Sequence, residues 1–388
     1  MAAVVLLVVG IAAMFLRPFG MPLWVGPVAA ALIGLVTRIG HWNGAADSLH
    51  LLTKPLLFLL FAVPLAILLD RIGVFEALAA TVDGGDHLVS GLWLLATAVT
   101  IVFNLDASVV LLTPLYIRIA QRHGYSPEML AFQPALLACL ASNPLPVSNL
   151  TNLIVAEHFH LSVGDFLHYL VLPTIAACVV GLVFFRRAFD VDNIHVEHFA
   201  EPVDRRALAR GLPIVGFVLV GFTAGSALGV PEWVVAAIAV LWAGLLAAHV
   251  PWRAVPYEAM LVAAGLGVLV AGAGSSLRLA SIFDATGVVG HGRVLLYGVV
   301  ASDASNNLPA VLAGEVALRD RSQVWPLLLG ANVGPVLVIS GALSGLLWRD
   351  TARRMGVQVS ARRYSEVGVK VGLPALVVAA VVLLLFLM

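Results

Sequence analysis

The chain alternates long apolar runs with short polar connections, and eight of the runs predict simple membrane-spanning helices. A helix needs about 20 apolar residues to cross a hydrocarbon core of about 30 Å. The shortest runs, near 15 residues, must therefore extend into their flanks or thin the bilayer. Continuous runs of this kind are not the alternating pattern of a membrane β-barrel. The eight runs are residues 2–16, 22–37, 53–70, 164–185, 211–228, 232–249, 256–273 and 365–387.

Two longer apolar stretches are broken in the middle by polar residues, prolines and glycines. Residues 128–158 contain SNPLPVSNLTN (142–152), and residues 323–350 contain ANVGPVLVISGA (331–342). Unwound backbone at mid-membrane depth is tolerated only where protein or a water-filled cavity satisfies its polar groups. We therefore expect two broken helices.

Two further stretches predict hairpins whose apolar arms flank a polar tip. Residues 88–121 have the tip NLDAS (104–108), and residues 288–319 have the tip SDASNNLP (302–309). Arms of about 12–16 residues are short for a full crossing. This length favours re-entrant hairpins, which enter and leave on one side, over ordinary pairs of crossings.

The chain divides into two similar halves around its only long polar segment. Residues 1–187 and 211–388 each hold three spans, a hairpin, a broken span and a final span, and residues 188–210 link them. Pro144 and Pro335, one in each break, are 191 positions apart, close to half of the 388 residues. Five crossings per half invert the second half relative to the first. The expected fold is an all-α polytopic membrane protein, an inverted repeat of about ten transmembrane helices.

Composition agrees with this architecture. Hydrophobic residues make up 61% of the chain, charged residues 11%, and the mean hydropathy is +1.01. Soluble domains carry roughly 25% charged residues. These values exclude a cytosolic enzyme, a nucleic-acid-binding protein and a disordered chain. Cys139 and Cys178 lie in apolar runs without a zinc motif, so we expect two small buried hydrophobes and no metal or cofactor.

The placement of the basic residues predicts an orientation in the membrane. With residues 188–210 in the cytoplasm, sixteen Lys and Arg residues fall inside and six outside, as the positive-inside rule expects. We therefore expect a multi-pass protein of the inner (plasma) membrane, with both termini extracytoplasmic. Residues 2–16 follow no basic segment, so they predict a first transmembrane helix rather than a signal peptide.

The polar residues of the breaks and tips are the candidate solute and ion ligands, because transporters built from inverted repeats bind their solutes at such interruptions. None of the four clusters contains an arginine, which argues against an anion carrier that relies on bidentate contacts. The candidates are Asn104, Asp106, Ser108, Ser148, Asn149, Thr151, Asn152, Asp303, Ser305, Asn306, Asn307, Asn332 and Ser340.

Asp106 is the candidate coupling group. A carboxylate between apolar arms costs several kcal/mol to ionise without a partner, so it is expected to be protonatable or paired. It also fits the N-cap of the following arm, and the two roles are compatible. Asp303, 197 positions later, is expected to be its counterpart in the repeat. His158 and His160 end a span without a third ligand nearby and are expected to be interfacial.

Four stretches resemble the bacterial arsenite/antimonite permeases. They are DASVVLLTPLYI (106–117), SNLTNLIVAEHF (148–159), NNLPAVLAG (306–314) and GANVGPVLVISGALSGLLW (330–348), and the resemblance runs over essentially the whole chain. These permeases share a superfamily, and its inverted repeat with two re-entrant hairpins, with sodium/proton antiporters and dicarboxylate transporters. The resemblance implies proton-driven export of arsenite or antimonite. In some systems a cytosolic ATPase subunit is the partner.

Three positions depart from the permease pattern. Leu105 stands where these permeases often have Asn, and Val338 and Ala342 stand where they have hydroxyl residues. These departures concern the substrate more than the fold. A sodium/proton antiporter or another small-solute or anion carrier is therefore the alternative, and a passive channel is a third. An intramembrane enzyme is not expected, since the chain has no HExxH motif, and no P-loop is present for direct ATP coupling.

Overall fold

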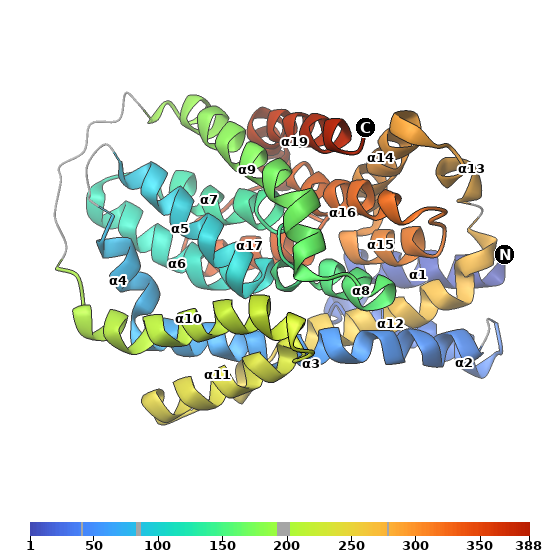
Figure 1. Cartoon of the computed structure of the whole chain (residues 1–388), viewed down its shortest axis with the longest axis horizontal. Coiled ribbons are helices and arrows are strands. Elements are labelled where there is room, and N and C mark those ends of the chain that lie inside the picture. The colour runs from blue at the N-terminus through green and yellow to red at the C-terminus, as the bar shows by residue number, and fades with distance from the viewer. Residues whose placement is uncertain (40–41, 83–86, 192–201, 278) are drawn as a thin grey trace.

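The computed structural model describes residues 1–388 except 40–41, 83–86, 192–201 and 278 (Figure 1). Every regular element among the described residues is a helix, as expected. Much of the predicted linker 188–210 lies outside the described residues, and helix α10 already begins at Arg205.

The helices follow the predicted order of spans, hairpins and breaks. In the first half they are α1 (Ala2–Leu16), α2 (Val25–Val36), α3 (Trp42–Ile72), α4 (Val74–Ala80), α5 (Leu88–Phe103), α6 (Leu105–His123), α7 (Pro127–Leu140), α8 (Leu150–Phe159) and α9 (Val163–Ala188). In the second half they are α10 (Arg205–Ala227), α11 (Glu232–Ala247), α12 (Tyr257–Ala273), α13 (Ala280–Phe283), α14 (Gly287–Ser305), α15 (Asn307–Glu315), α16 (Val324–Val333), α17 (Leu343–Arg354), α18 (Ala361–Val367) and α19 (Leu373–Phe386).

Four of the described helical stretches are long and apolar enough to cross a membrane, and six shorter helices are also apolar. The long ones are 44–72, 163–188, 205–225 and 361–386. Helix α3 differs from its predicted span because it begins at Trp42 instead of 53. Its first turns carry Asp47, Ser48 and His50, which line a cavity described below. A search for apolar runs therefore misses this part of the helix.

Both predicted breaks are present. Helix α7 ends at Leu140 and α8 begins at Leu150, and Pro144 and Pro146 lie in the irregular segment between them. Proline has no backbone N–H and clashes with the preceding turn, so it cannot continue the helix. The second break runs between α16 and α17 and contains the 3₁₀ turn Gly334–Val336.

The hairpin tips share one unusual backbone conformation. Asn104 joins α5 to α6 with φ 83° and ψ 150°, and Asn306 joins α14 to α15 with φ 108° and ψ 149°. Each amide oxygen accepts the N–H two residues on, from Asp106 (2.9 Å) and Leu308 (3.2 Å) respectively. The two asparagines are thus geometric equivalents. The expected pairing of Asp106 with Asp303 is wrong, because Asp106 lies in the first turn of α6 and Asp303 in the last turn of α14.

The same geometry corrects the expected N-cap of α6. The capping side chain is that of Asn104, and Asp106 lies two residues inside the helix. A residue other than glycine at positive φ is uncommon, and asparagine is one of the few that adopt it readily. With ψ near 150° the conformation is strained, and such strain clusters at functional sites.

Glycines bring helix backbones together within the second half. A Cβ on Gly330 of α16 would lie 2.2 Å from the carbonyl oxygen of Leu295 on α14, and one on Gly298 would lie 2.8 Å from the backbone nitrogen of Ala331. Small residues allow this close approach between membrane helices. The α14–α16 crossing therefore depends on the absence of side chains at these two positions.

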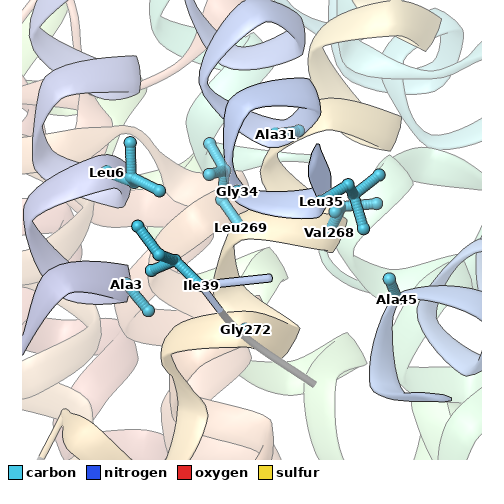
Figure 2. A pocket seen from close by; sticks show the side chains of 10 residues that line it. All are labelled: Ala3, Leu6, Ala31, Gly34, Leu35, Ile39, Ala45, Val268, Leu269 and Gly272. Carbon is cyan, nitrogen blue, oxygen red and sulfur yellow. The ribbon is translucent and has the colours of Figure 1, made fainter. Parts of the chain in front are cut away.

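A small apolar pocket lies among α1, α2, α12 and the start of α3 (Figure 2). Its volume is about 20 Å³, and all ten lining residues are apolar, including Leu6, Leu35, Val268 and Leu269. Such a pocket offers no side-chain partner to a polar solute. The solute site must be sought elsewhere.

Both cysteines are free and buried, as expected. Cys139 lies on α7 and Cys178 on α9. The two halves of the chain are in contact through several helices. Helix α17 packs on α6 and α7, and α8 packs on α15 and α16. The breaks and the hairpins thereby come together in the interior.

Candidate functional site

Both hairpin tips, the first break and helix α17, which follows the second break, contribute to one cavity of about 40 Å³, which we call the central cavity. This volume holds a few water molecules. Its polar lining consists of Asp106, Asn149, Thr151, Asn306 and Asn307. Apolar residues close it from α1, α12, the tips and the helices after the breaks: Met14, Leu23, Leu105, Leu150, Ala259, Val262, Leu308, Leu343 and Leu346.

Four helices begin at the central cavity: α6, α8, α15 and α17. The first N–H groups of a helix lack partners within it, and the helix dipole places partial positive charge at that end. Asparagine side chains cap three of the four, namely Asn104, Asn149 and Asn306, whereas α17 has no side-chain cap. The convergent N-termini favour a carboxylate or polar oxygen atoms in the cavity, although none of its lining residues is Arg or Lys.

Asn332 of α16 joins the two breaks. Its Oδ1 accepts hydrogen bonds from Asn149 Nδ2 (3.0 Å) and Thr151 Oγ1 (2.7 Å). Its Nδ2 donates to Asn143 Oδ1 (3.2 Å) and Asn152 Oδ1 (2.7 Å). The side chain thus uses both donors and both acceptor positions of its amide. Asn143 was not predicted as a site residue, although its place in the first break was a usable signal.

Asn152 fastens the unwound backbone of the first break. Its Nδ2 donates to the carbonyl oxygens of Ser142 and Leu145, both at 3.0 Å. Buried carbonyl groups left by an interrupted helix need such partners. Asn152 and Asn332 do not line the central cavity. Their contacts indicate that they hold the breaks in place.

Several buried polar atoms have no hydrogen-bond partner among the described residues. They include Asp106 Oδ1 at the central cavity and Asn104 Nδ2 at the first tip. Unpaired buried polar atoms are costly, and each calls for an explanation such as a water, ion or solute. Asp106 is therefore available for a proton or a bound solute.

Asp303 lies apart from the central cavity. Its Oδ1 has no hydrogen-bond partner among the described residues, and it would lie 2.9 Å from a Cβ on Gly341. Cys139 and Tyr364 are close enough to interact with its charge. Asp303 therefore lies beside Gly341 of the second break and does not line the central cavity.

The second tip is joined to the second break by the main chain. The N–H of Asn307 donates to the carbonyl oxygen of Gly341 at 2.7 Å. The side chain of Asn306 donates to the carbonyl oxygen of Ser340 at 3.4 Å. Ser340 thus contacts the site through its backbone and not through its predicted hydroxyl.

The remaining predicted serines bond away from the central cavity. Ser108 shares a 2.7 Å hydrogen bond with Thr100 between the arms of the first hairpin. The hydroxyl of Ser148 donates to the carbonyl oxygen of Leu145, and that of Ser305 to the carbonyl oxygen of Ala301. These contacts give the three serines a structural role in this conformation.

The chain resembles known proteins in both sequence and fold. A family model described as the CitMHS citrate transporter matches residues 1–334. The arsenical pump membrane protein of Escherichia coli (strain K12) is 26% identical over 409 residues, covering 95% of each chain. The arsenical pump membrane protein of Yersinia enterocolitica is 27% identical over 411 residues, again covering 95% of each.

Among solved structures, the Alcanivorax borkumensis YdaH transporter, described as having an unusual topology, superimposes with a TM-score of 0.61. The match covers 91% of this chain and 88% of that chain at 15% identity, so it supports the fold alone. The expected kinship with arsenite/antimonite permeases is confirmed by the relatives. The family match spans most of the sequence, and the chain therefore belongs to the CitMHS citrate transporter family of membrane transporters.

Proposed function

We propose that the chain is a secondary active transporter of the inner membrane that exports arsenite or antimonite in exchange for protons. The central cavity carries this proposal, because it brings one carboxyl group, three amides and a hydroxyl together without a cationic side chain. At neutral pH arsenite is mostly an uncharged trihydroxide. Amides and hydroxyls supply both donors and acceptors for such a solute.

Asp106 is proposed as the group that couples transport to protons. Its Oδ1 is buried and has no hydrogen-bond partner within the described part of the chain, and the N-terminus of α6 lies beside it. The carboxyl group can hold a proton when the cavity is empty of solute and release it when solute oxygens compete for the same space. This alternation would tie solute movement to proton movement in the opposite direction.

The inverted repeat, the re-entrant hairpins and the orientation are part of this proposal. The like conformations of Asn104 and Asn306, together with the two breaks, support a repeat of 1–187 in 211–388. The linker 188–210 is proposed to face the cytoplasm, with both termini outside. A cytosolic ATPase subunit remains an optional partner, supported only by the word "pump" in the names of the relatives.

The test uses purified protein in vesicles with an imposed pH gradient. We expect arsenite to accumulate against its own concentration gradient while the pH gradient is present. Accumulation should stop when an ionophore dissipates the pH gradient. Cells without arsenite efflux should gain arsenite tolerance when they express the chain. Arsenite that only equilibrates across the membrane, with or without the pH gradient, would reduce the protein to a passive channel and overturn the proposal. Sodium movement that is coupled to proton movement in the absence of arsenite would favour a sodium/proton antiporter.

A second candidate is a carrier of a carboxylate anion such as citrate. The four helix N-termini at the central cavity favour it, because they attract anions without any arginine. The description of the family also names citrate. The same vesicles separate the candidates, since saturable citrate uptake without arsenite transport would replace the first proposal by the second.

A further inference from the structure

A second, larger cavity lies at the far ends of the helices that line the central cavity. Its volume is about 520 Å³, and we call it the vestibule. Helix α8 contributes Thr151 to the central cavity and His158 to the vestibule, and α15 contributes Asn307 to one and Glu315 to the other. Seven residues of helix separate Thr151 from His158, a rise of about 10 Å. The two cavities are therefore close neighbours along the same helices.

An apolar plug separates the two cavities. Ile154 of α8, Leu266 of α12, and Leu308 and Leu312 of α15 are buried and belong to one hydrophobic cluster. Leu308 also lines the central cavity and Leu312 the vestibule, whereas Ile154 and Leu266 lie along their helices between the lining residues of the two cavities. The packing of apolar side chains is enough to close the path between the two cavities. A shift of these side chains would connect the cavities.

The vestibule has a strongly titratable lining. Its acids and histidines come from α3, from the end of α8 and its C-cap, and from α15: Asp47, His50, Glu157, His158, His160 and Glu315. No group of three such side chains among the described residues is arranged to hold a metal ion. The lining therefore points to proton chemistry, for which histidine and carboxyl groups are the usual carriers.

Glu315 is the buried member of this lining. Its side chain is only 4% exposed, its Oε2 has no hydrogen-bond partner among the residues that the structure describes, and its Oε1 lies 3.8 Å from Nδ1 of His158. Glu157, in contrast, is paired with Lys54 at 2.7 Å. Helix α14 also packs against α15. Its Tyr297 hydroxyl donates a hydrogen bond to the carbonyl oxygen of Ala310.

The arginines that follow α15 are engaged by other acids. Arg319 pairs with Asp284 at 3.0 Å, and Arg321 lies 3.9 Å from Asp165. Neither is among the residues that line the vestibule. Among the described residues, His158 is thus the ionic neighbour of the Glu315 carboxyl group, which lies in the wall of the vestibule.

We propose that the vestibule is a water-filled entrance to the central cavity and that Glu315, with His158, exchanges protons with the water in it. In the exchange, Nδ1 of a protonated His158 gives its proton to Oε1 of Glu315, which leaves a neutral imidazole and a neutral carboxylic acid. This inference rests on the proposed proton-coupled transport. It adds an entry point for protons at Glu315, at the end of α15 opposite to Asn307, which lines the central cavity with Asp106.

The first test measures water access and needs no transport. In a background with Cys139→Ala and Cys178→Ala, a single cysteine is introduced on α12, either by Ala271→Cys in the vestibule or by Ala263→Cys, which is buried in the same hydrophobic cluster as the plug residues. We expect a water-soluble thiol reagent to label the Ala271→Cys protein in lipid vesicles and to leave the Ala263→Cys protein unlabelled. Equal protection of both positions would overturn the entrance.

The second test measures protonation directly. Infrared spectra of the purified protein over a pH series should contain the C=O band of a protonated carboxylic acid that disappears in Glu315→Gln. The matched control Glu366→Gln changes an exposed glutamate that is paired with Arg362, and it should leave the band in place. Identical spectra of wild type and Glu315→Gln would remove Glu315 from proton exchange.

The third test connects both results to function. Glu315→Gln vesicles should lose the pH dependence of solute accumulation and keep exchange down a gradient, whereas Glu366→Gln vesicles should match the wild type. Wild-type pH dependence in Glu315→Gln would overturn the role of Glu315. If neither the wild type nor any variant moves arsenite, the proposed function fails. The labelling and infrared results then still decide whether the vestibule admits water and whether Glu315 exchanges protons.

Discussion

Nδ2 of Asn332 donates a 2.7 Å hydrogen bond to Oδ1 of Asn152, although the two residues are 180 positions apart. One lies on the helix before the second break and the other on the helix after the first. Asn332 is 1% exposed and Asn152 is fully buried. The side-chain amide of Asn332 therefore connects the two breaks and fixes their relative position.

We predict that Asn332→Ala lowers the free energy of unfolding by roughly 3 kcal/mol or more, because it leaves several buried polar groups unpaired and each costs about 1–3 kcal/mol. Thermal unfolding of the purified protein measures the change. Ser305→Ala serves as the control, since its hydroxyl bonds only to backbone carbonyls of α14 and the adjoining Asn306, and its cost should stay below about 1 kcal/mol. Similar melting of both variants would contradict the prediction.

Asp106→Asn should uncouple transport while leaving the fold intact. Asn104 caps α6, so the substitution removes only the interaction of a charge with the helix N-terminus, about 0.3–1 kcal/mol. Vesicles with Asp106→Asn should exchange solute down its gradient but fail to concentrate it at any pH. Asp303→Asn is the matched comparison, because Asp303 does not line the central cavity. Wild-type coupling in Asp106→Asn, with an unchanged pH profile, would reject the assignment.

Substitutions at Asn306 should separate the two demands on a hairpin tip. Glycine tolerates φ 108° but lacks the capping side chain, whereas alanine loses the cap and is strained as well. We therefore expect stability to fall from wild type to Asn306→Gly and further to Asn306→Ala, with the alanine variant about 1–3 kcal/mol below wild type. Melting temperatures give the order. An alanine variant as stable as the glycine variant would show that the backbone there is unstrained.

Gly330→Ala should destabilise the protein by about 1–3 kcal/mol, the usual cost of overpacking. Its new Cβ would lie 2.2 Å from the carbonyl oxygen of Leu295, so α14 and α16 must separate. Gly216→Ala on α10 is the control, because nothing lies within 4 Å of its Cβ position, and alanine should stabilise that helix by up to about 1 kcal/mol. Equal effects of the two substitutions would contradict the close α14–α16 contact.

Single-cysteine labelling tests the orientation. In the background without Cys139 and Cys178, an impermeant reagent applied to intact cells should label Met388→Cys and should not label Asp204→Cys. Disrupted cells should allow both to react, which controls for accessibility. Labelling of Asp204→Cys from outside would reverse the orientation of the linker.

The helices could be predicted because each apolar run ends at residues that stop helices. The break between α7 and α8 is marked by Pro144 and Pro146, and α6 ends at Gly124 with φ 75°. Local sequence carries such signals. It carries none for the start of α3, where Asp47, Ser48 and His50 line the vestibule.

The site was predicted as a set of residue types, and its internal arrangement was not. Asn149, Thr151, Asn306 and Asn307 do line one cavity with Asp106. Other predicted residues, such as Asn152 and Asn332, only hold the breaks in place. Which residue takes which role depends on contacts between distant segments, such as that of Asn332 with Asn152. No local pattern encodes such contacts. Glu315 was missed for the same reason, since its partner His158 comes from the other half of the chain.

The enclosure of both cysteines bears on how quickly a cargo can leave. Trivalent arsenic and antimony bond to thiolate sulfur, a soft ligand that also holds other soft metal centres firmly. Cys139 and Cys178 are 1% and 8% exposed, and neither lines the central cavity. The polar side chains that the proposed cargo would meet in that cavity offer oxygen and nitrogen atoms and no thiolate, and their hydrogen bonds break and re-form readily. For such a cargo this lining would favour short residence over tight capture.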